Sequence, residues 1–197
     1  IAQLTVLLVF IAVIAYCIFR SLRSKVEIKI RDIAAIDALD EAVGRCAEMG
    51  RPLHFSTGGG KLSDDSAMQT VAGLSILRAL ARKTAKYNVN IVCSIHMPEV
   101  QSITEEIVRN AYIAEGRGDQ YRDDMVRFIS DQQTAYMAGT VSLLANERVA
   151  ASVLVGAWFY EAWPVAEAGA LLGAFQIGGT ARTAQLPTFV ATCDYFF

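Results

Sequence analysis

The sequence has few of the residues that usually build metal centres or disulfide frameworks. It contains two histidines, His54 and His96, and four cysteines scattered along the chain. No two cysteines form a CxxC pair, and none has a neighbouring histidine. This spacing argues against a zinc site and against a secreted domain held together by disulfides. We therefore predict no metal site.

Charge and catalytic motifs are also scarce. Charged residues make up 19% of the chain and the formal net charge is −2. A domain without an excess of positive charge has no general field that recruits nucleic acid, so we expect no nucleic-acid partner. The sequence has no GxSxG elbow, no HExxH and no paired-carboxylate motif. No motif therefore indicates an enzyme or names a cofactor.

Hydrophobic residues, by contrast, are in excess. They make up 53% of the chain, and residues 1–19, IAQLTVLLVFIAVIAYCIF, contain no charged residue. As a helix this run spans about 28 Å, close to the hydrocarbon thickness of a bilayer. A cleaved signal peptide is the competing interpretation, but it would have a shorter apolar core, a charged start and a small-residue cleavage site. We predict a retained transmembrane helix over residues 1–20 that contacts the lipid membrane.

Positive charge follows this run. The charged residues here are Arg20, Arg23, Lys25, Lys29 and Arg31, against Glu27 and Asp32. The cluster predicts that the rest of the chain faces the cytoplasm, as in a single-pass protein of the cell membrane, and we interpret it as contacting lipid headgroups. Residues 21–35 form a basic juxtamembrane segment in this interpretation, with a short strand at KVEIKI. Because the chain starts at Ile1 and stops on the apolar CDYFF, we expect the natural protein to be longer.

From residue 36 onward, apolar segments alternate with helical patterns. The segments expected as strands are PLHFS, VNIVCSIH, DMVRFIS, VAASVLVGAW, FQIGG and TFVATCDYFF. A helix should precede the first strand and end at Gly50, and another should begin at Pro98. Strands that are apolar throughout and separated by helices are typical of βαβ units. We predict one Rossmann-like, three-layer α/β domain over residues 36–197, with a mostly parallel sheet.

Residues 149–174 are apolar enough to suggest a second membrane span. However, Glu161 and Glu167 fall in the middle, and each would cost about 2.5 kcal/mol at the bilayer centre. Pro164 also interrupts the helical ladder. We favour a packed helix whose small residues permit close contact in the core or between subunits.

Several candidate ligand-binding residues follow the predicted strands. Ligands of open parallel sheets bind beyond the carboxyl ends of the strands. The candidates at those ends are Gly58, Gly59, Gly60, Lys61, Ser94, His96, Asp131 and Arg182. Together they offer a glycine loop, a histidine, an acid and two cations. His96 occupies a better position for acid–base work than His54, which we expect to be packed inside a strand.

The glycine loop matches no phosphate-binding motif. STGGGKLS fails GxxxxGK[ST] because Leu62 follows the lysine, and GxGxxG fails because there is no third glycine. Its backbone amides can still hold an anion. The alternative is a mobile connection in which Asp64, Asp65 and Ser66 cap the next helix. For Arg182 the alternatives are a clamp for a carboxylate or phosphate and a tie between the last loops.

Several runs, taken together, resemble a known family. They are DEAVGRCAEMGRPLHFS, VAGLSILRALAR, EEIVRNAY with AEG, MVRFISDQQTAY and GTARTAQLPTFVATCDY. They resemble an uncharacterised prokaryotic family of membrane-anchored domains of unknown function, over roughly residues 37–195. The resemblance implies a membrane protein that continues with further apolar segments, and it brings no catalytic residues with it.

Two functions remain in view. In the first, the anchored domain is a structural or accessory subunit of a membrane assembly and self-associates through residues 149–174, where Trp158, Phe159 and Trp163 supply contact area. In the second, it binds a nucleotide or another anionic metabolite over residues 58–61, either as a binding domain or as an enzyme.

Overall fold

The computed structural model describes residues 2–23 and 33–197. The chain divides into two units, Ile1–Asp32 and Ile33–Phe197. The first contains helix α1 (Ala2–Arg23), and among the described helices only its stretch Gln3–Ser21 is long and apolar enough to cross a membrane, a criterion that a signal sequence also meets. The predicted strand KVEIKI lies outside the described residues.

The second unit is an α/β domain built on one parallel sheet. Its strands are β1 (Leu53–Gly58), β2 (Ile91–Ile95), β3 (Val126–Phe128), β4 (Ala151–Ala157), β5 (Phe175–Gly179) and β6 (Tyr195–Phe196). Every neighbouring pair is parallel, and the order is β3-β2-β1-β4-β5-β6. This is the strand order of the Rossmann fold, so the predicted fold class is confirmed.

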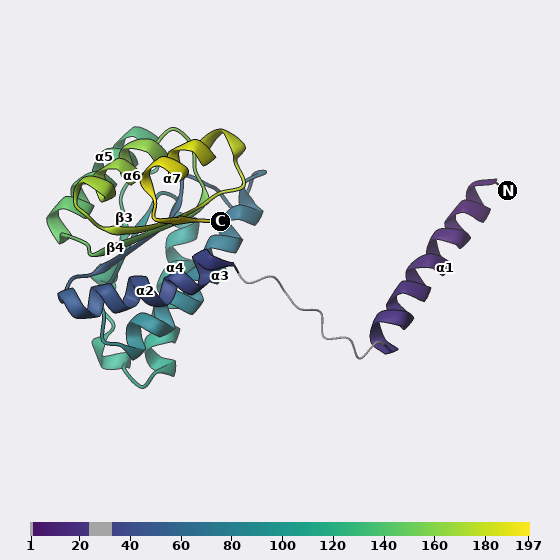
Figure 1. The fold of residues 1–197 in the computed structure, drawn as a ribbon, viewed down its shortest axis with the longest axis horizontal. Coiled ribbons are helices and arrows are strands. Elements are labelled where there is room, and N and C mark those ends of the chain that lie inside the picture. The colour runs from purple at the N-terminus through teal and green to yellow at the C-terminus, as the bar shows by residue number, and fades with distance from the viewer. Residues whose placement is uncertain (1, 24–32) are drawn as a thin grey trace. The chain divides into compact units, whose positions relative to one another are not determined.

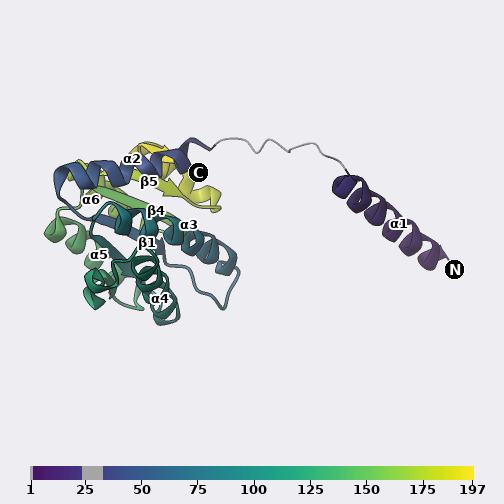
Figure 2. The same ribbon diagram turned by 90° about the horizontal axis from the view of Figure 1, so that it is seen from below.

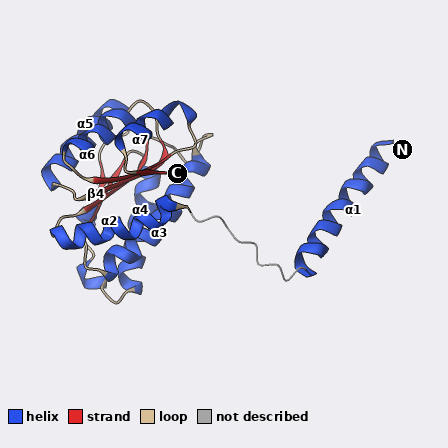
Figure 3. Cartoon of the chain, in the orientation of Figure 1, coloured by secondary structure: helices blue, strands red, loops and turns tan. Residues whose placement is uncertain are grey.

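Helices cover both faces of the sheet. They are α2 (Ala34–Met49), α3 (Ala67–Lys86), α4 (Pro98–Ala114), α5 (Gln133–Glu147), α6 (Ala162–Leu171) and α7 (Leu186–Thr192). Figure 1 shows α5, α6 and α7 on one side of the sheet and α2, α3 and α4 on the other. Figure 2 shows the same arrangement from below. Figure 3 shows the strands as the central layer. The fold therefore has three layers.

Each side of the sheet has its own hydrophobic cluster. The larger one joins α2, α3 and α4 to strand residues such as Leu53, Phe55 and Ile91. The smaller one joins α5, α6 and α7 to Leu154 and to Trp158, which follows β4. All residues of β1, β2, β4 and β5 are buried. Burial on both faces explains why these strands are apolar along most of their length.

Two predicted helix boundaries are confirmed. Gly50 ends α2 in the left-handed conformation (φ 62°), and its N–H points back to the carbonyls of the last turn, a conformation that glycine adopts without strain. Pro98 opens α4, where its missing N–H costs nothing because a first-turn N–H has no partner within the helix.

The last predicted strand is largely wrong. TFVATCDYFF, residues 188–197, forms most of α7 and only the two-residue strand β6. The β-branched run suggested a strand, but Pro187 starts a helix and the Thr192 hydroxyl donates to the Thr188 carbonyl at 2.7 Å, one turn back. Of the expected strand DMVRFIS, only Val126–Phe128 form a strand, β3, which lies at the edge of the sheet.

Candidate functional site

The strand order reverses between β1 and β4, at the centre of the sheet. In doubly wound sheets, ligands bind in the crevice beyond the carboxyl ends of the strands at this reversal. Here two segments meet at that place: residues 59–66, between β1 and α3, and residues 158–161, between β4 and α6.

Gly58, which ends β1, and Gly59 and Gly60 of the first segment are all buried, and Gly58 and Gly60 press against the end of β4. A Cβ on Gly58 (φ 75°) would lie 2.5 Å from the Ala157 carbonyl oxygen, and one on Gly60 would lie 2.6 Å from the Ala157 Cβ. Real Cβ atoms do not make such contacts. The glycines therefore permit close packing of the two loops.

Glu161 completes this packing. Its side chain is fully buried, and its Oε1 accepts hydrogen bonds from the backbone N–H of Gly59 (3.2 Å) and Phe159 (3.1 Å). Its Oε2 accepts one from the Gln133 side chain of α5. Sequence analysis noticed Glu161 only as an obstacle to a membrane span. The signal available in the sequence was an acidic residue within an apolar run, because such a carboxylate needs hydrogen-bond donors when the run is buried.

Two more carboxylates bind the same loop. Glu99 of α4 accepts a hydrogen bond from the Leu62 N–H at 3.0 Å, and Asp64 accepts one from the Ser66 N–H at 2.8 Å. The Ser66 hydroxyl also donates to Asp64, and these bonds hold the pKa of the Asp64 carboxyl below its usual value. Three backbone N–H groups of this segment, which could have bound an anion, therefore donate to carboxylates of the chain itself.

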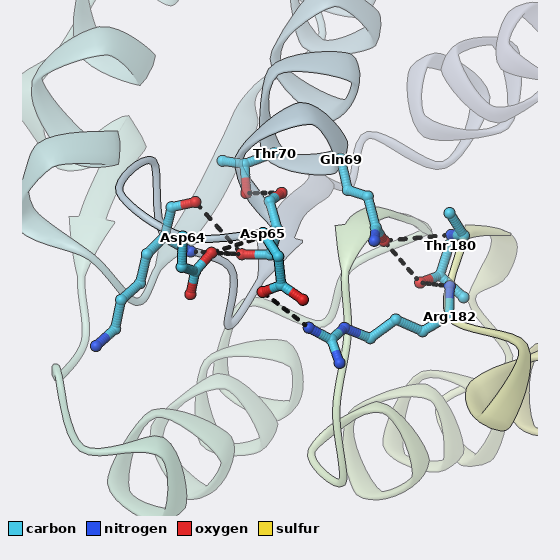
Figure 4. Close-up of polar contacts among 9 residues, drawn as sticks. Asp64, Asp65, Gln69, Thr70, Thr180 and Arg182 are labelled. Atoms are coloured by element: carbon cyan, nitrogen blue, oxygen red, sulfur yellow. Dashed lines mark hydrogen bonds and ion pairs between the residues drawn. The ribbon is translucent and has the colours of Figure 1, made fainter.

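Arg182 lies on the opposite side of the crevice from the start of α3. Figure 4 shows it reaching toward Asp65, with its Nη2 3.8 Å from the Asp65 carboxylate. Asp65 is 88% exposed, so this pair contributes little. The guanidinium carbon lies 4.0 Å from the centroid of the Phe159 ring. Its Nε is buried and has no hydrogen-bond partner among the described residues.

A cavity of about 340 Å³ opens beside Arg182. It is lined by Trp158, Phe159, Tyr160 and residues 181–185. A volume of this size suits a small organic molecule. The backbone around Arg182 is held in place, because Thr180 accepts from the Arg182 N–H at 3.2 Å and Gln69 accepts from the Ala181 N–H at 3.3 Å.

Ser94 belongs to a different environment. It lies within the sheet, where its hydroxyl is 2.9 Å from Nε2 of His54. The other ring nitrogen of His54 is 2.9 Å from the Ser152 hydroxyl, so His54 joins β2, β1 and β4. Burial lowers the pKa of His54 to about 3 and keeps the ring neutral at physiological pH. The prediction that His54 is packed is confirmed.

His96 lies at the end of β2 and is also buried. Its Nδ1 is 2.7 Å from the Ser130 carbonyl oxygen. Because a carbonyl only accepts, Nδ1 carries a proton and donates this hydrogen bond. The ring packs against Tyr136, with centroids 4.9 Å apart. The Tyr136 hydroxyl lies 2.5 Å from that of Ser56, and burial raises its pKa to about 12.

The remaining predicted residues do not join one cluster. Lys61 and Asp131 are exposed, and within residues 2–23 and 33–197 the Asp131 side chain makes no hydrogen bond or ion pair. In the same ranges no three His, Cys, Asp or Glu side chains are grouped to hold a metal ion. Most of the predicted site residues therefore lie at or beyond the carboxyl ends of the strands, in separate places, and Ser94 lies within β2.

The chain matches a family model over its whole length. The family model described as "Domain of unknown function (DUF6754)" matches residues 1–197. The chain belongs to the DUF6754 family. No curated protein and no solved structure matches it. Membership of DUF6754 confirms the resemblance to a family of unknown function, so the function must be argued from the geometry.

Proposed function

We propose that this chain is a membrane-anchored structural or accessory subunit whose α/β domain associates with a second copy of itself. The observation that carries the proposal is the outer face of α6. There Trp163 is 49% exposed and Leu171 is 83% exposed, and Glu167 is the only charged residue of the helix. A helix this apolar is usually covered on all sides.

The packing of the carboxyl edge also favours an interaction role. At the reversal point, where related folds hold a cofactor, the glycines and Glu161 of this chain fill the space. Four carboxylates (Asp64, Asp65, Glu99 and Glu161) surround the loop against the two cations Lys61 and Arg182. An excess of negative charge around the loop disfavours the binding of polyphosphates, and therefore of a dinucleotide.

A second copy is the partner that best suits an anchored domain. In this proposal α1 inserts in the cell membrane, and the basic residues Arg20 and Arg23 in its last turn keep the domain in the cytoplasm. Copies anchored in one membrane share an orientation and a high local concentration, which strengthens a weak contact. An exposed Trp with neighbouring small residues is a suitable centre for a two-fold interface.

Trp158 and Phe159 were also expected from the sequence to supply contact area, and the structure makes Trp158 unsuitable. Trp158 is fully buried and packs edge-on against Phe189, with ring centroids 6.1 Å apart. Phe159 is only half-buried but is engaged by Arg182. The proposed contact therefore rests on α6 and excludes the end of β4.

The test is the mass of the full chain in mild detergent, measured by light scattering and native mass spectrometry. We expect a dimer that the double variant Trp163→Glu and Leu171→Glu converts to monomer. The matched control is Ile113→Glu, a 58% exposed residue of α4 on the other side of the sheet, which should leave the dimer intact. A monodisperse wild-type monomer would contradict the proposal.

Anchoring has its own test. We expect the chain to stay in the membrane pellet after an alkaline wash, and the domain to be digested by protease in inside-out vesicles but protected in right-side-out ones. Release into the supernatant, or the opposite pattern of protection, would contradict the proposed topology.

One observation favours a second function, the binding of a small anionic metabolite. The buried Nε of Arg182 has no hydrogen-bond partner in the described part of the chain, and the side chain lies beside a cavity walled by aromatic rings, which suits a single carboxylate or phosphate on a planar group. A thermal-shift screen of nucleotides, phosphorylated metabolites and aromatic carboxylates tests this. Any stabilisation should disappear in Arg182→Gln and persist in Arg78→Gln, an exposed position on α3. A screen without a stabilising compound would remove this function.

A further inference from the structure

The buried carboxylate of Glu161 has the surroundings of a bound anion. Two backbone N–H groups, from Gly59 and Phe159, point at the same oxygen, and a side-chain amide of α5 binds the other oxygen. No Lys, Arg or His forms an ion pair with it in the described ranges. Converging backbone N–H groups are how proteins hold small oxyanions.

The loop is shaped around this oxygen. A Cβ on Gly59 would lie 2.9 Å from Oε1 of Glu161, so any other residue there would push the carboxylate away. Gly59 and Glu161 are 102 residues apart in sequence and lie in the loops that follow β1 and β4, the two strands between which the strand order reverses. The contact therefore occupies the place where a doubly wound domain receives the oxyanions of its ligand.

We infer that the Gly59 loop is an oxyanion-binding site whose resident anion is the side chain of Glu161. The carboxylate supplies the negative charge that an external ligand supplies in related folds, and it closes the crevice. It also links the loop after β1 to Phe159 and Gln133. This inference is separate from the proposed self-association, because the Glu161 side chain is fully buried, whereas the proposed contact uses the exposed side chains of Trp163 and Leu171.

The test is chemical rescue in the full chain in detergent. Glu161→Ala removes the carboxylate and leaves its N–H donors unpaired, so the midpoint of thermal unfolding should fall by about 6–12 °C. Formate at about 100 mM should enter the vacated space and restore about 3–6 °C, if its dissociation constant there is about 10 mM. Sodium chloride of equal ionic strength should restore less.

Three controls separate a bound anion from a general salt effect. The wild type should gain nothing from formate over chloride, because its site is filled. Glu161→Gln should also gain nothing, because the amide occupies the same space. Glu99→Ala, which removes an exposed carboxylate of α4 that accepts a hydrogen bond from the same loop, should lose little stability and show no rescue.

Formate that fails to raise the midpoint of Glu161→Ala above chloride would overturn the inference, as would an equal gain in the wild type. If Glu161→Ala does not fold in chloride, the same comparison is made on folded yield during purification. Folded protein should then be recovered in formate only, and its absence from both preparations would count against the inference.

Discussion

The two faces of the sheet differ in chemistry although both are buried. The face toward α2, α3 and α4 carries residues such as Leu53, Phe55 and Ile95, and its contacts are apolar. The face toward α5, α6 and α7 carries a row of polar residues: His54, Ser56, Ser94, Ser152 and Gln176. Alternate residues of one strand therefore meet different surroundings.

The polar face is held by specific pairings. Ser56 donates to the Ser94 carbonyl at 2.9 Å, and the Gln176 side-chain amide donates at 2.8 Å to the carbonyls of Ala166 in α6 and Thr192 in α7. Buried polar groups are stable only when they find partners. The comparison teaches that burial alone does not define a core: one face is held by area and shape, and the other by partners at specific positions.

Phe55→Ala should have the largest effect. Phe55 is fully buried in the larger cluster, and removing its ring leaves a cavity that the sheet cannot close. We expect the free energy of unfolding to fall by about 3–5 kcal/mol, measured by urea denaturation of the full chain in detergent. A loss below about 1 kcal/mol would mean that this face is not the stabilising one.

The adjacent residue tests the polar face. His54→Leu fills a similar space but leaves the Ser94 and Ser152 hydroxyls without their partner, so we expect a loss of about 2–3 kcal/mol. Replacing both serines by alanine in the same chain removes the unpaired groups, and the triple variant should recover to within about 1 kcal/mol of the wild type. Non-recovery would show that His54 contributes by shape and not by hydrogen bonding.

The smallest effect is a dependence on pH. The pKa of His54 is about 3 in the folded state and about 6.5 when unfolded, so only the unfolded state takes up the proton between these values. Stability is therefore complete above about pH 6.5 and falls as the pH drops toward 3, by up to about 1.4 kcal/mol per unit.

This dependence is measured by denaturation at pH 7 and pH 5.5, a window above the titration of ordinary carboxylates, where the expected loss is about 1–1.5 kcal/mol. His54→Gln should flatten it, and His96→Gln should leave the His54 contribution in place. A slope that is unchanged in His54→Gln would show that other groups cause it.

The sequence predicted more of the sheet than of its edge. Apolar strands alternating with amphipathic helices indicated a parallel three-layer domain, and Gly50 and Pro98 marked helix ends, because these signals lie within one element. The failure at residues 188–197 has the opposite cause. There a β-branched run favoured a strand, but Phe189 packs against Trp158 as part of a helix, and that contact cannot be seen locally.

Most of the candidate residues lie at or beyond the carboxyl ends of the strands, but what each of them contacts was not predictable. Gly58, Gly59 and Gly60 stood out as a loop, yet what they pack against comes from β4 and from Glu161, about a hundred residues later. Ser94 was assigned to the edge by its position, and its partner is the His54 ring within the sheet. Both sets of contacts join segments that are distant in the chain.

By itself, the sequence determined most of the helices and strands, that the strands are covered on both faces, and that a helix that includes the uncharged residues 2–19 precedes the domain. Those properties follow from the spacing of apolar residues within a few turns, which the covalent chain sets locally. Only the tertiary structure decided that β1 lies beside β4, that Glu161 fills the glycine loop and that Arg182 is left beside a cavity. The reason is that the strand order brings together side chains that are far apart in the sequence, and a local sequence pattern does not indicate such contacts.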